Sequence, residues 1–536
     1  MHTGPIPRIP APSTAPVGRI EPDAAPVGPQ EPAPYTGTIR ISPRRRWGAL
    51  SVLMLPVLLV AVDNTALSFA VPMISEALHP TGNQLLWIVD IYPLILAGLL
   101  VPMGATGDRI GRRRILLIGG TGFALISAAA AFAPSAAWLI AARGAMGFFG
   151  AMVMPAVLSL IRNIFIDPTE RRTAIALWAA GFSGGAALGP IVGGFLLEHF
   201  SWGSVFLLAV PVMLPMLVLG PLLIPESRDP RPGPVDPPSI LLVMATMIPL
   251  VYAIKHGSTS GLDALVAGCV LVSVAAGVLF TRRQLRRSTP MLDVRLFARP
   301  VFSGAVGANL LSVFSLVGFL YFVSQHLQLV SGHSPMQAGL LLIPGLALTI
   351  VMGLAVVPIV RRVRPAQVVA GGLLLNAVGF GLVAIAGPMG SDIGLLTAFA
   401  ILGAGIGAAE TISNDLILAA VPPHQAGAAS AISETAYETG SVLGTAVLGS
   451  ILNAVYRTHL DVPAGVDAAA ADAAQETLGG AAQVAEELDP QAGAALMESA
   501  RHAFDSGVLY TGLIGMVLML AAAVMAVRTL REARAT

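Results

Sequence analysis

The chain has 536 residues, of which 55% are hydrophobic and 11% are charged, and its mean hydropathy is +0.77. This composition, with many apolar runs near twenty residues long, excludes an ordinary soluble domain and predicts a multi-pass helical membrane protein. The net charge of +1 is uninformative, and the single cysteine, Cys269, excludes an intramolecular disulfide or a cysteine metal cluster.

The chain begins with a proline-rich segment, residues 1–46, which lacks periodicity and ends in three arginines. We expect it to be a disordered cytosolic tail. The rest of the chain holds fourteen apolar runs, each long enough to span a bilayer as a helix. These runs lie at 48–72, 84–106, 114–133, 136–161, 173–197, 203–224, 239–256, 262–281, 301–326, 337–360, 367–388, 394–420, 425–455 and 507–528.

The predicted spans divide into two six-helix halves with two helices inserted between them. An offset of 255 residues aligns Gly185–Gly194 with Gly440–Gly449, and such internal repeats are typical of transporters whose halves rock about a central site. The predicted parts are residues 47–224 for the amino-terminal half, 225–238 for a cytosolic linker, 239–281 for the inserted helices, and 300–528 for the carboxyl-terminal half with an outer loop at 456–504.

The distribution of basic residues predicts the orientation. The two tails and alternate loops carry 27 of the 31 Lys and Arg residues; Lys255, Arg457 and Arg501 fall on the other side and Arg143 falls within a span. Because basic residues accumulate in cytoplasmic loops, we expect both termini in the cytoplasm. The arginine-rich usage favours a bacterial protein, and hence the bacterial plasma membrane.

The loop after the second span, Gly104–Arg114, combines glycines, an acid and four arginines. One interpretation is topology alone, since arginines belong on the cytoplasmic side. The other is a conformational latch, in which Asp108 caps a helix end or pairs with an arginine across the halves. The latch would be formed by Gly104, Asp108, Arg109, Gly111 and Arg112.

Ionisable residues inside spans are costly, at roughly 2.5–3.5 kcal/mol each on insertion scales, so each one suggests a function. Some of them could attract a lipophilic cation and others could carry protons, and the alternative for each is an interhelical hydrogen bond. We expect Asp63 and Glu410 to be the principal charge sites. The full set of candidates is Asp63, Asp90, Arg143, Glu410, Asp415, Glu434 and Glu438.

The fifth span carries glycines four residues apart, which form one bare stripe on a helix. A neighbouring helix can approach such a stripe backbone to backbone, which is how membrane helices pack tightly. The alternative to a role in switching is tight packing and nothing more. The residues concerned are Gly181, Gly185, Gly189, Pro190, Gly193 and Gly194.

With these motifs the chain resembles the major facilitator superfamily, and specifically its fourteen-helix drug:proton antiporter branch. Gly104–Arg114 resembles the signature loop between helices 2 and 3, and Gly181–Leu196 resembles the antiporter motif of helix 5. Further matches are Asp63-Asn64-Thr65 with Pro72 in helix 1, Arg143 with Gly147 in helix 4, and Trp87–Tyr92 and Ile432–Glu438, which are similar to segments of quaternary-ammonium and mycobacterial-type multidrug efflux pumps. The segment Ser201–Phe206 departs from the pattern, since many relatives carry a second tryptophan and an arginine there. This departure weakens only the assignment to a sub-branch.

The resemblance implies a proton-coupled antiporter that exports lipophilic cationic compounds such as quaternary ammonium compounds, dyes and antibiotics. We expect no enzyme, cofactor or metal site, since no GxxxxGK[ST] loop, HExxH motif or cysteine cluster occurs, and a proton gradient would supply the energy. The expected partners are cationic small molecules, protons and membrane lipid, without nucleic acid. One alternative is an exporter of an endogenous antibiotic, siderophore or lipid, and another is a non-transporting membrane sensor whose outer loop binds a partner.

Overall fold

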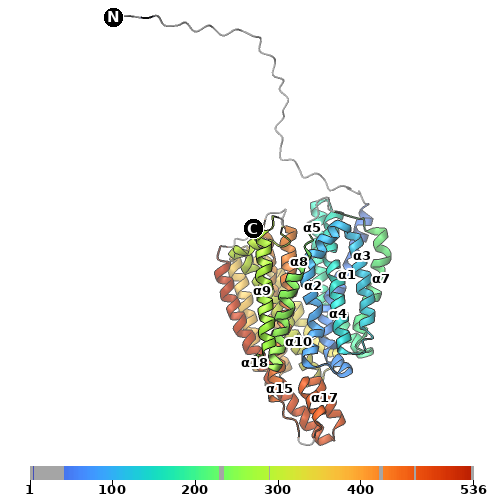
Figure 1. Cartoon of the computed structure of the whole chain (residues 1–536), viewed down its shortest axis with the longest axis vertical. Helices are drawn as coiled ribbons and strands as arrows, with labels where there is room; N and C mark the ends of the chain where they lie inside the picture. The colour runs from blue at the N-terminus through green and yellow to red at the C-terminus, as the bar shows by residue number, and fades with distance from the viewer. Residues whose placement is uncertain are drawn as a thin grey trace. The chain divides into compact units, whose positions relative to one another are not determined.

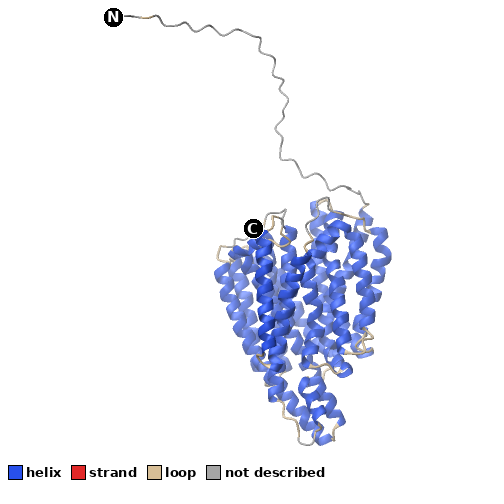
Figure 2. Cartoon of the chain, viewed as in Figure 1, coloured by secondary structure: helices blue, strands red, loops and turns tan. Residues whose placement is uncertain are grey.

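The computed structural model describes residue 4 and residues 42–228, 235–288, 290–421, 426–463 and 466–532. Within these ranges every regular element is a helix (Figure 2), which confirms the predicted all-α fold. Apart from Gly4 and the residues from Ser42 onward, the predicted disordered tail lies outside the described residues. The middle of the predicted linker at 225–238 also lies outside them.

The amino-terminal half is a set of long helices joined by short turns (Figure 1). A capping box at Thr81, whose hydroxyl accepts the Gln84 amide hydrogen, starts the second helix. A break after Leu207 divides the sixth predicted span into two helices. The helices are α1 (Pro43–Leu78), α2 (Gly82–Ile110), α3 (Arg112–Ala130), α4 (Ala136–Ile164), α5 (Pro168–His199), α6 (Ser204–Leu207) and α7 (Ala209–Leu223).

Two helices, α8 (Pro237–Ser260) and α9 (Ala264–Arg286), follow and pack on each other. The carboxyl-terminal half then repeats the pattern of the first half. Its elements are η1 (Val294–Ala298), α10 (Pro300–Gln325), η2 (His326–Val330), α11 (Pro335–Val360), α12 (Pro365–Ala386), α13 (Asp392–Ala419), α14 (Ala426–Gly444), η4 (Thr445–Gly449), α15 (Ser450–His459), α16 (Ala468–Glu476), α17 (Leu478–Glu487) and α18 (Pro490–Thr529).

The predicted number of fourteen spans is matched approximately. Thirteen helical segments among the described residues are long and apolar enough to cross a membrane. The helix α5, which is 32 residues long and some of whose side chains lie outside the described residues, is not among these thirteen.

The glycine stripe of α5 packs against α1. A Cβ on Gly185 would lie 2.8 Å from Ala61 Cβ and 3.0 Å from the Leu58 carbonyl oxygen, and one on Gly193 would lie 3.0 Å from Ala66 Cβ. Side chains at these positions would therefore push the two helices apart.

The same packing recurs in the carboxyl-terminal half, between α10 and α14. A Cβ on Gly440 would overlap the Leu310 carbonyl, and one on Gly444 would lie 2.6 Å from the Phe314 carbonyl oxygen. Gly440 and Gly444 are the residues that the 255-residue offset pairs with Gly185 and Gly189 of α5. The pseudo-symmetry predicted from the repeat is therefore present in the helix packing.

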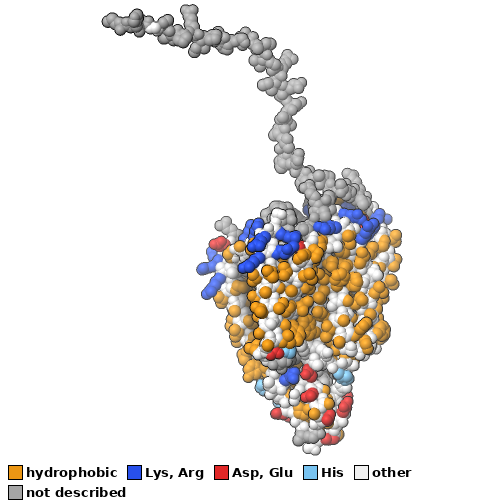
Figure 3. Space-filling view, in the orientation of Figure 1, with side chains coloured by type: hydrophobic (Ala, Val, Ile, Leu, Met, Phe, Trp, Pro, Cys, Tyr) orange, Lys and Arg blue, Asp and Glu red, His pale blue; other side chains and the backbone are white. Residues whose placement is uncertain are grey.

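The two ends of the bundle differ in charge (Figure 3). Lys and Arg side chains gather at one end, which we call the arginine-rich end. Asp, Glu and His side chains are frequent at the other end, around α16 and α17, which we call the hairpin end. Hydrophobic side chains cover the band between the two ends, as expected for a surface that faces lipid.

The two halves are joined at the hairpin end. Ser324 Oγ of α10 donates to the Ser68 carbonyl of α1 at 2.8 Å, and a Glu476 carboxylate oxygen accepts from the Gly82 amide at 2.7 Å. A Cβ on Gly194 of α5 would lie 2.7 Å from Met336 Cα of α11. These contacts close the bundle at the hairpin end.

An ion cluster fastens α8 to α9 at the arginine-rich end. Arg283 donates two hydrogen bonds to the Asp236 carboxylate, at 2.9 and 3.0 Å, while Ser239 also donates to it and Arg287 lies 3.4 Å away. The Arg283 guanidinium, with Ser239 and Arg287, lowers the pKa of Asp236 from its ordinary 3.8 to about 2.

Candidate functional site

A buried ion pair links α1 to α4 in the amino-terminal half. Arg143 Nη1 donates to Asp63 Oδ2 at 2.7 Å, and the two side chains are 1% and 5% exposed. Both residues come from the predicted set, and the structure brings them into direct contact. A charge at either position in an apolar span is costly unless it is paired, so each residue needs the other.

The Arg143 guanidinium has further partners that fix its orientation. Its Nε donates to the Ile88 carbonyl of α2 at 3.2 Å, and its Cζ lies 4.6 Å from the centre of the Tyr92 ring and 5.9 Å from that of Phe206. A guanidinium over an aromatic face gains a cation–π interaction. Arg143 therefore connects α1, α2 and α4 to α6.

The acids of the carboxyl-terminal half form a second group. Glu410 of α13 and Glu434 of α14 are both half-buried, and their carboxylates interact electrostatically. Glu438, one turn beyond Glu434, is 2% exposed. Tyr437 interacts electrostatically with all three glutamates.

A tyrosine of the amino-terminal half connects the two groups. Tyr92 of α2 is fully buried and interacts electrostatically with Asp63 and Arg143 in its own half and with Glu438 in the other. Tyr92 therefore lies in contact with Arg143 and within electrostatic range of Glu438 in the other half.

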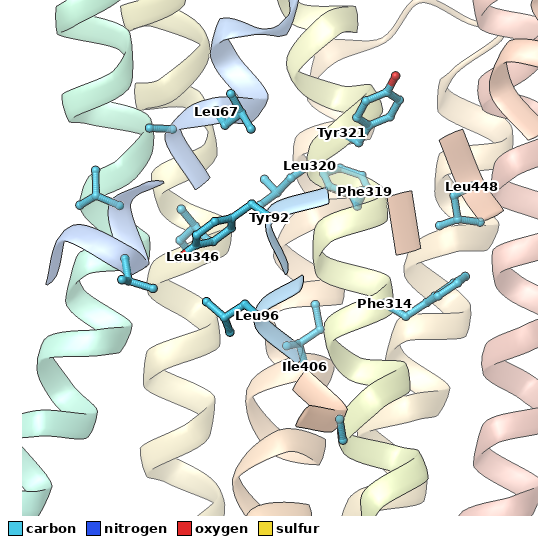
Figure 4. Packing of buried hydrophobic residues seen from close by; sticks show 14 of the residues in the cluster. Leu67, Tyr92, Leu96, Phe314, Phe319, Leu320, Tyr321, Leu346, Ile406 and Leu448 are labelled. Carbon is cyan, nitrogen blue, oxygen red and sulfur yellow. The ribbon is translucent and has the colours of Figure 1, made fainter. Parts of the chain in front are cut away.

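A small cavity lies between the halves beside these groups. Its polar lining comes from Asn64, Thr65 and Ser68 of α1 and from Tyr437 and Ser441 of α14. Its apolar lining includes Leu320 and Leu346, which lie with Tyr92 among the buried side chains where the halves meet (Figure 4). The lining of this small cavity therefore comes from both halves.

Asp90 is buried in a separate ion pair with a helix that sequence reasoning treated as a plain insertion. Lys255 Nζ of α8 lies 2.8 Å from Asp90 Oδ2 of α2, and the two side chains are 0% and 1% exposed. The sequence analysis counted Lys255 on the outer side, at the end of the predicted span 239–256. In the structure α8 continues to Ser260, and the Lys255 side chain is buried against α2.

Asp415 is not part of either group. Its side chain is exposed, and it lies more than one helical turn along α13 from Glu410 toward the arginine-rich end. Hydration accounts for a carboxylate in that position without any role in binding.

The segment Gly104–Arg114, expected as a loop, consists of the end of α2 and the start of α3 with Gly111 between them, and it contains one salt bridge. Arg112 Nη2 lies 2.7 Å from Asp108 Oδ1, so in this conformation the acid pairs within its own half. Gly111 has a φ of +117°, and a Cβ there would lie 2.6 Å from Glu226 Oε1, so only glycine fits this turn. A Cβ on Gly104 would lie 3.4 Å from Pro155 Cβ of α4, which is ordinary van der Waals contact.

Glu226 is a member of this loop site that sequence reasoning missed. Its carboxylate accepts the Arg113 amide hydrogen at 3.1 Å and lies 3.8 Å from the Nε atoms of Arg113 and Arg114. The signal was present in the sequence, since Glu226 is an acid at the start of the linker between two arginine-rich segments. Lys255 was recognised in the sequence as a basic residue on the outer side, but its pairing with Asp90 was not predicted.

No candidate metal site is found in the described part of the chain, where no group of three or more His, Cys, Asp or Glu side chains is arranged to hold an ion.

Comparison with known proteins identifies relatives over most of the chain. A model of the Major Facilitator Superfamily matches residues 53–445. The chain is 54% identical over 482 residues to the multidrug efflux pump LfrA of Mycolicibacterium smegmatis, covering 90% of this chain and 96% of that protein. It is 39% identical to the methyl viologen resistance protein SmvA of Salmonella typhimurium, over 86% of this chain and 93% of that protein.

More distant relatives share the fold. The tetracenomycin C resistance and export protein of Streptomyces glaucescens is 33% identical, with 76% of each chain covered. Among solved structures, a bacterial homologue of the lysosomal transporter Spinster in an inward-facing conformation has a TM-score of 0.66 at 18% identity, covering 92% of this chain and all of that one.

Proposed function

Because the chain belongs to the major facilitator superfamily, we propose that it is a proton-coupled multidrug efflux antiporter that exports lipophilic cations. The observation that carries the proposal is the set of buried and half-buried carboxylates on the two sides of the contact between the halves. Asp63 is paired with Arg143, whereas Glu410, Glu434 and Glu438 add negative charge on the other side when they are ionised.

The names of the relatives support drugs and organic cations as the substrate class. LfrA is a multidrug efflux pump, and SmvA confers resistance to methyl viologen, which is a bipyridinium dication. A substrate of that kind presents positive charge on flat apolar rings. Carboxylates beside an apolar wall suit both parts of such a molecule.

In the proposed cycle, the half-buried Glu410 and Glu434 receive the cation, and Asp63 exchanges a proton. Arg143 holds Asp63 in the conformation described here. Protonation of Asp63 removes the negative charge from that pair and frees the guanidinium, which changes the balance between the two conformations of the halves. Tyr92, between Asp63 and Glu438, provides the contact through which a charge change in one half is felt in the other.

A proton gradient is the proposed energy source. One proton in for one monovalent cation out moves no net charge, so the pH gradient alone drives it, at about 1.4 kcal/mol for a tenfold gradient. Exchange of two protons per cycle would permit electroneutral export of a dication. Any excess of protons over substrate charges would add the membrane potential to the driving force.

We propose that the arginine-rich end faces the cytoplasm of a bacterial cell and that the hairpin end faces outward. The conformation described here, closed at the hairpin end, would then be closed toward the outside. Substrate would enter from the cytoplasm or from the inner leaflet of the membrane.

The test uses inside-out membrane vesicles that contain a pH probe and are energised to an acidic interior. Ethidium added outside should release protons from wild-type vesicles, and the release should be lost in Asp63→Asn. Vesicles with Asp415→Asn are the matched control, because that exposed acid lies apart from the site, and they should behave as wild type. No response of the wild type to ethidium or any other cation would contradict the proposal.

Export of an endogenous product is a second candidate, which the resemblance to the tetracenomycin C export protein supports. It differs in substrate charge, since neutral or anionic products would not need the carboxylates. If Asp63→Asn retained export of a neutral aromatic product while losing ethidium export, both functions would share the cavity and only cation export would depend on the acid.

A further inference from the structure

The Asp90–Lys255 pair has the chemistry of a cation-binding site. The Asp90 carboxylate supplies negative charge, and Lys255 Nζ also lies 4.2 Å from the centre of the Trp87 ring. Asp90 and Trp87 lie one helical turn apart on α2, so both are fixed on one rigid face. An acid beside an aromatic face is an arrangement that recognises organic ammonium ions.

The ammonium that fills this site comes from a helix whose apolar surface is largely exposed. Only 17% of the most apolar stretch of α8 is buried within the protein. At Gly98 of α2, a Cβ would overlap the Met244 methyl group of α8. The Lys255 side chain is nevertheless 0% exposed, because its ammonium is buried against Asp90 of α2.

The site lies where both halves meet the inserted helix. Leu94 of α2, Val251 of α8, and Val442 and Ala446 of the α14–η4 segment form a small apolar cluster separate from the main core. The α2–α14 contact is one of the seams between the halves, and the halves move against each other there in any rocking cycle. Movement of that seam therefore changes the surroundings of Asp90 and Trp87.

We propose that Asp90 and Trp87 form a binding site for a monovalent organic ammonium ion, which the Lys255 ammonium occupies in this conformation as a tethered competitor. A transported cation takes the place of Lys255 when α8 moves away from α2. The inference rests on the proposed export of cations. It gives α8 a function, namely to fill a cation site whenever substrate is absent from it.

Amine labelling tests the exchange on the unmodified protein, because Lys255 is the single lysine of the chain. In liposomes, Lys255 should react slowly with acetic anhydride, as measured by mass spectrometry of its peptide. Saturating ethidium should raise the rate roughly tenfold or more, since a ligand that replaces the ammonium shifts the population toward exposed lysine. An unchanged rate at ethidium concentrations that saturate binding would overturn the proposal.

Proton exchange driven by ethidium, measured on the same liposomes, separates this inference from the proposed function. Proton exchange without a change in Lys255 labelling would support the proposed antiporter function and would contradict the role of Lys255 as a tethered competitor. Faster labelling without proton exchange would support the cation site and contradict proton-coupled export.

Chemical rescue tests the site independently of transport. The side-chain atoms that Lys255→Ala removes correspond to n-propylammonium. This ion should raise the unfolding temperature of Lys255→Ala in a saturable way, while sodium chloride and 1-propanol at equal concentrations should not. Wild type, whose site is filled, and Lys255→Ala/Asp90→Asn, which lacks the acid, should show no such shift.

If Lys255→Ala is not recovered as folded protein, the purification is repeated with n-propylammonium present throughout. Recovery of monodisperse protein only with the ammonium ion supports the site. Failure to recover protein under either condition, or folded protein without a thermal shift, would mean that the ion pair is an anchor for α8 and would overturn the proposal.

Discussion

At the scale of residues, the Asp63–Arg143 pair is better explained by switching than by stability. Taking two charges out of water costs several kcal/mol each, and their attraction offsets this only with good geometry. The pair has that geometry, at 2.7 Å with a second bond from Arg143 to the Ile88 carbonyl. Because the attraction between the two charges only about offsets the cost of burying them, protonation of Asp63 would make the buried Arg143 charge unfavourable.

Removal of the Arg143 charge should leave the buried Asp63 carboxylate without its ion-pair partner. We expect Arg143→Gln to abolish ethidium efflux and to destabilise the protein by about 3 kcal/mol or more, because an uncompensated carboxylate remains buried. The double variant Asp63→Asn/Arg143→Gln should recover most of the thermal stability without recovering efflux. Equal unfolding temperatures for wild type and Arg143→Gln would contradict this interpretation.

Residue chemistry was predictable from the sequence, and the pairings were not. The rarity of ionisable residues in apolar spans identified Asp63, Asp90 and Arg143, since each such group is costly in lipid. Which acid meets Arg143 depends on the packing of α1 against α4. The contact between Asp90 and Lys255 depends on the position of α8 against α2, and no local sequence pattern predicts that position.

At the scale of elements, the glycine face of α5 determines how closely α1 can approach. Gly184 and Gly185 offer a matched comparison, because a Cβ on Gly184 would meet open space, whereas one on Gly185 would lie 2.8 Å from Ala61 Cβ. The two positions share one helix and the same chemistry. They differ only in what faces them.

Substitution by alanine should therefore separate packing from helix propensity. We expect Gly185→Ala to lower stability by about 1–3 kcal/mol through overpacking and to reduce efflux. Gly184→Ala should leave both unchanged or raise stability slightly, since alanine favours the helix. Thermal unfolding and ethidium efflux measure the two effects, and an equal loss in both variants would show that the α1–α5 contact is not the cause.

The Asp236 cluster makes the docking of α8 on α9 sensitive to acid. Because the folded pKa of about 2 lies below the ordinary 3.8, the stabilisation is present above pH 4 and is lost as the pH falls toward 2. Asp236→Asn should cost about 1–2 kcal/mol at neutral pH, less than the full pKa shift because Arg283 is partly exposed. The difference from wild type in unfolding free energy should decrease as the pH falls through the folded pKa of about 2 and should vanish below it, and a difference independent of pH would contradict the account.

Helix ends were harder to predict than helix positions. The last predicted span covers residues 507–528, whereas α18 begins at Pro490 and runs to Thr529. Its first turns are amphipathic and pack on α17, so they lack the apolar run that marks a span. The π-helical segments η2 and η4 have no sequence signal of this kind, because they depend on local packing.

At the scale of the whole molecule, the internal repeat could be predicted from the sequence because glycines recur at equivalent positions in the two halves. The pairing of α1 with α5 and of α10 with α14 uses the same spacing 255 residues apart, and only glycine permits either contact. The sequence did not predict which end of the bundle is closed in this conformation. Closure at the hairpin end rests on contacts between distant segments, such as Gly82 with Glu476 and Ser68 with Ser324.

These contacts imply that a cycle of transport must break them together. The carboxylates lie between the closed hairpin end and the arginine-rich end, and the cavity beside them is lined by both halves. A rocking motion that opens the hairpin end would separate α1 from α10 and α2 from α14. Charge at Asp63 and Glu438, on opposite sides of that seam, is placed to influence the motion.

The central claim is that cation export is driven by the proton gradient through Asp63. The most direct measurement reconstitutes the purified protein in liposomes, clamps the membrane potential at zero with valinomycin and potassium, and imposes a pH gradient, acidic inside. We predict ethidium uptake against its own gradient in the wild type, proportional to the imposed pH difference and absent in Asp63→Asn. Uptake that persists without the pH gradient, or that is equal in Asp63→Asn, would contradict the account.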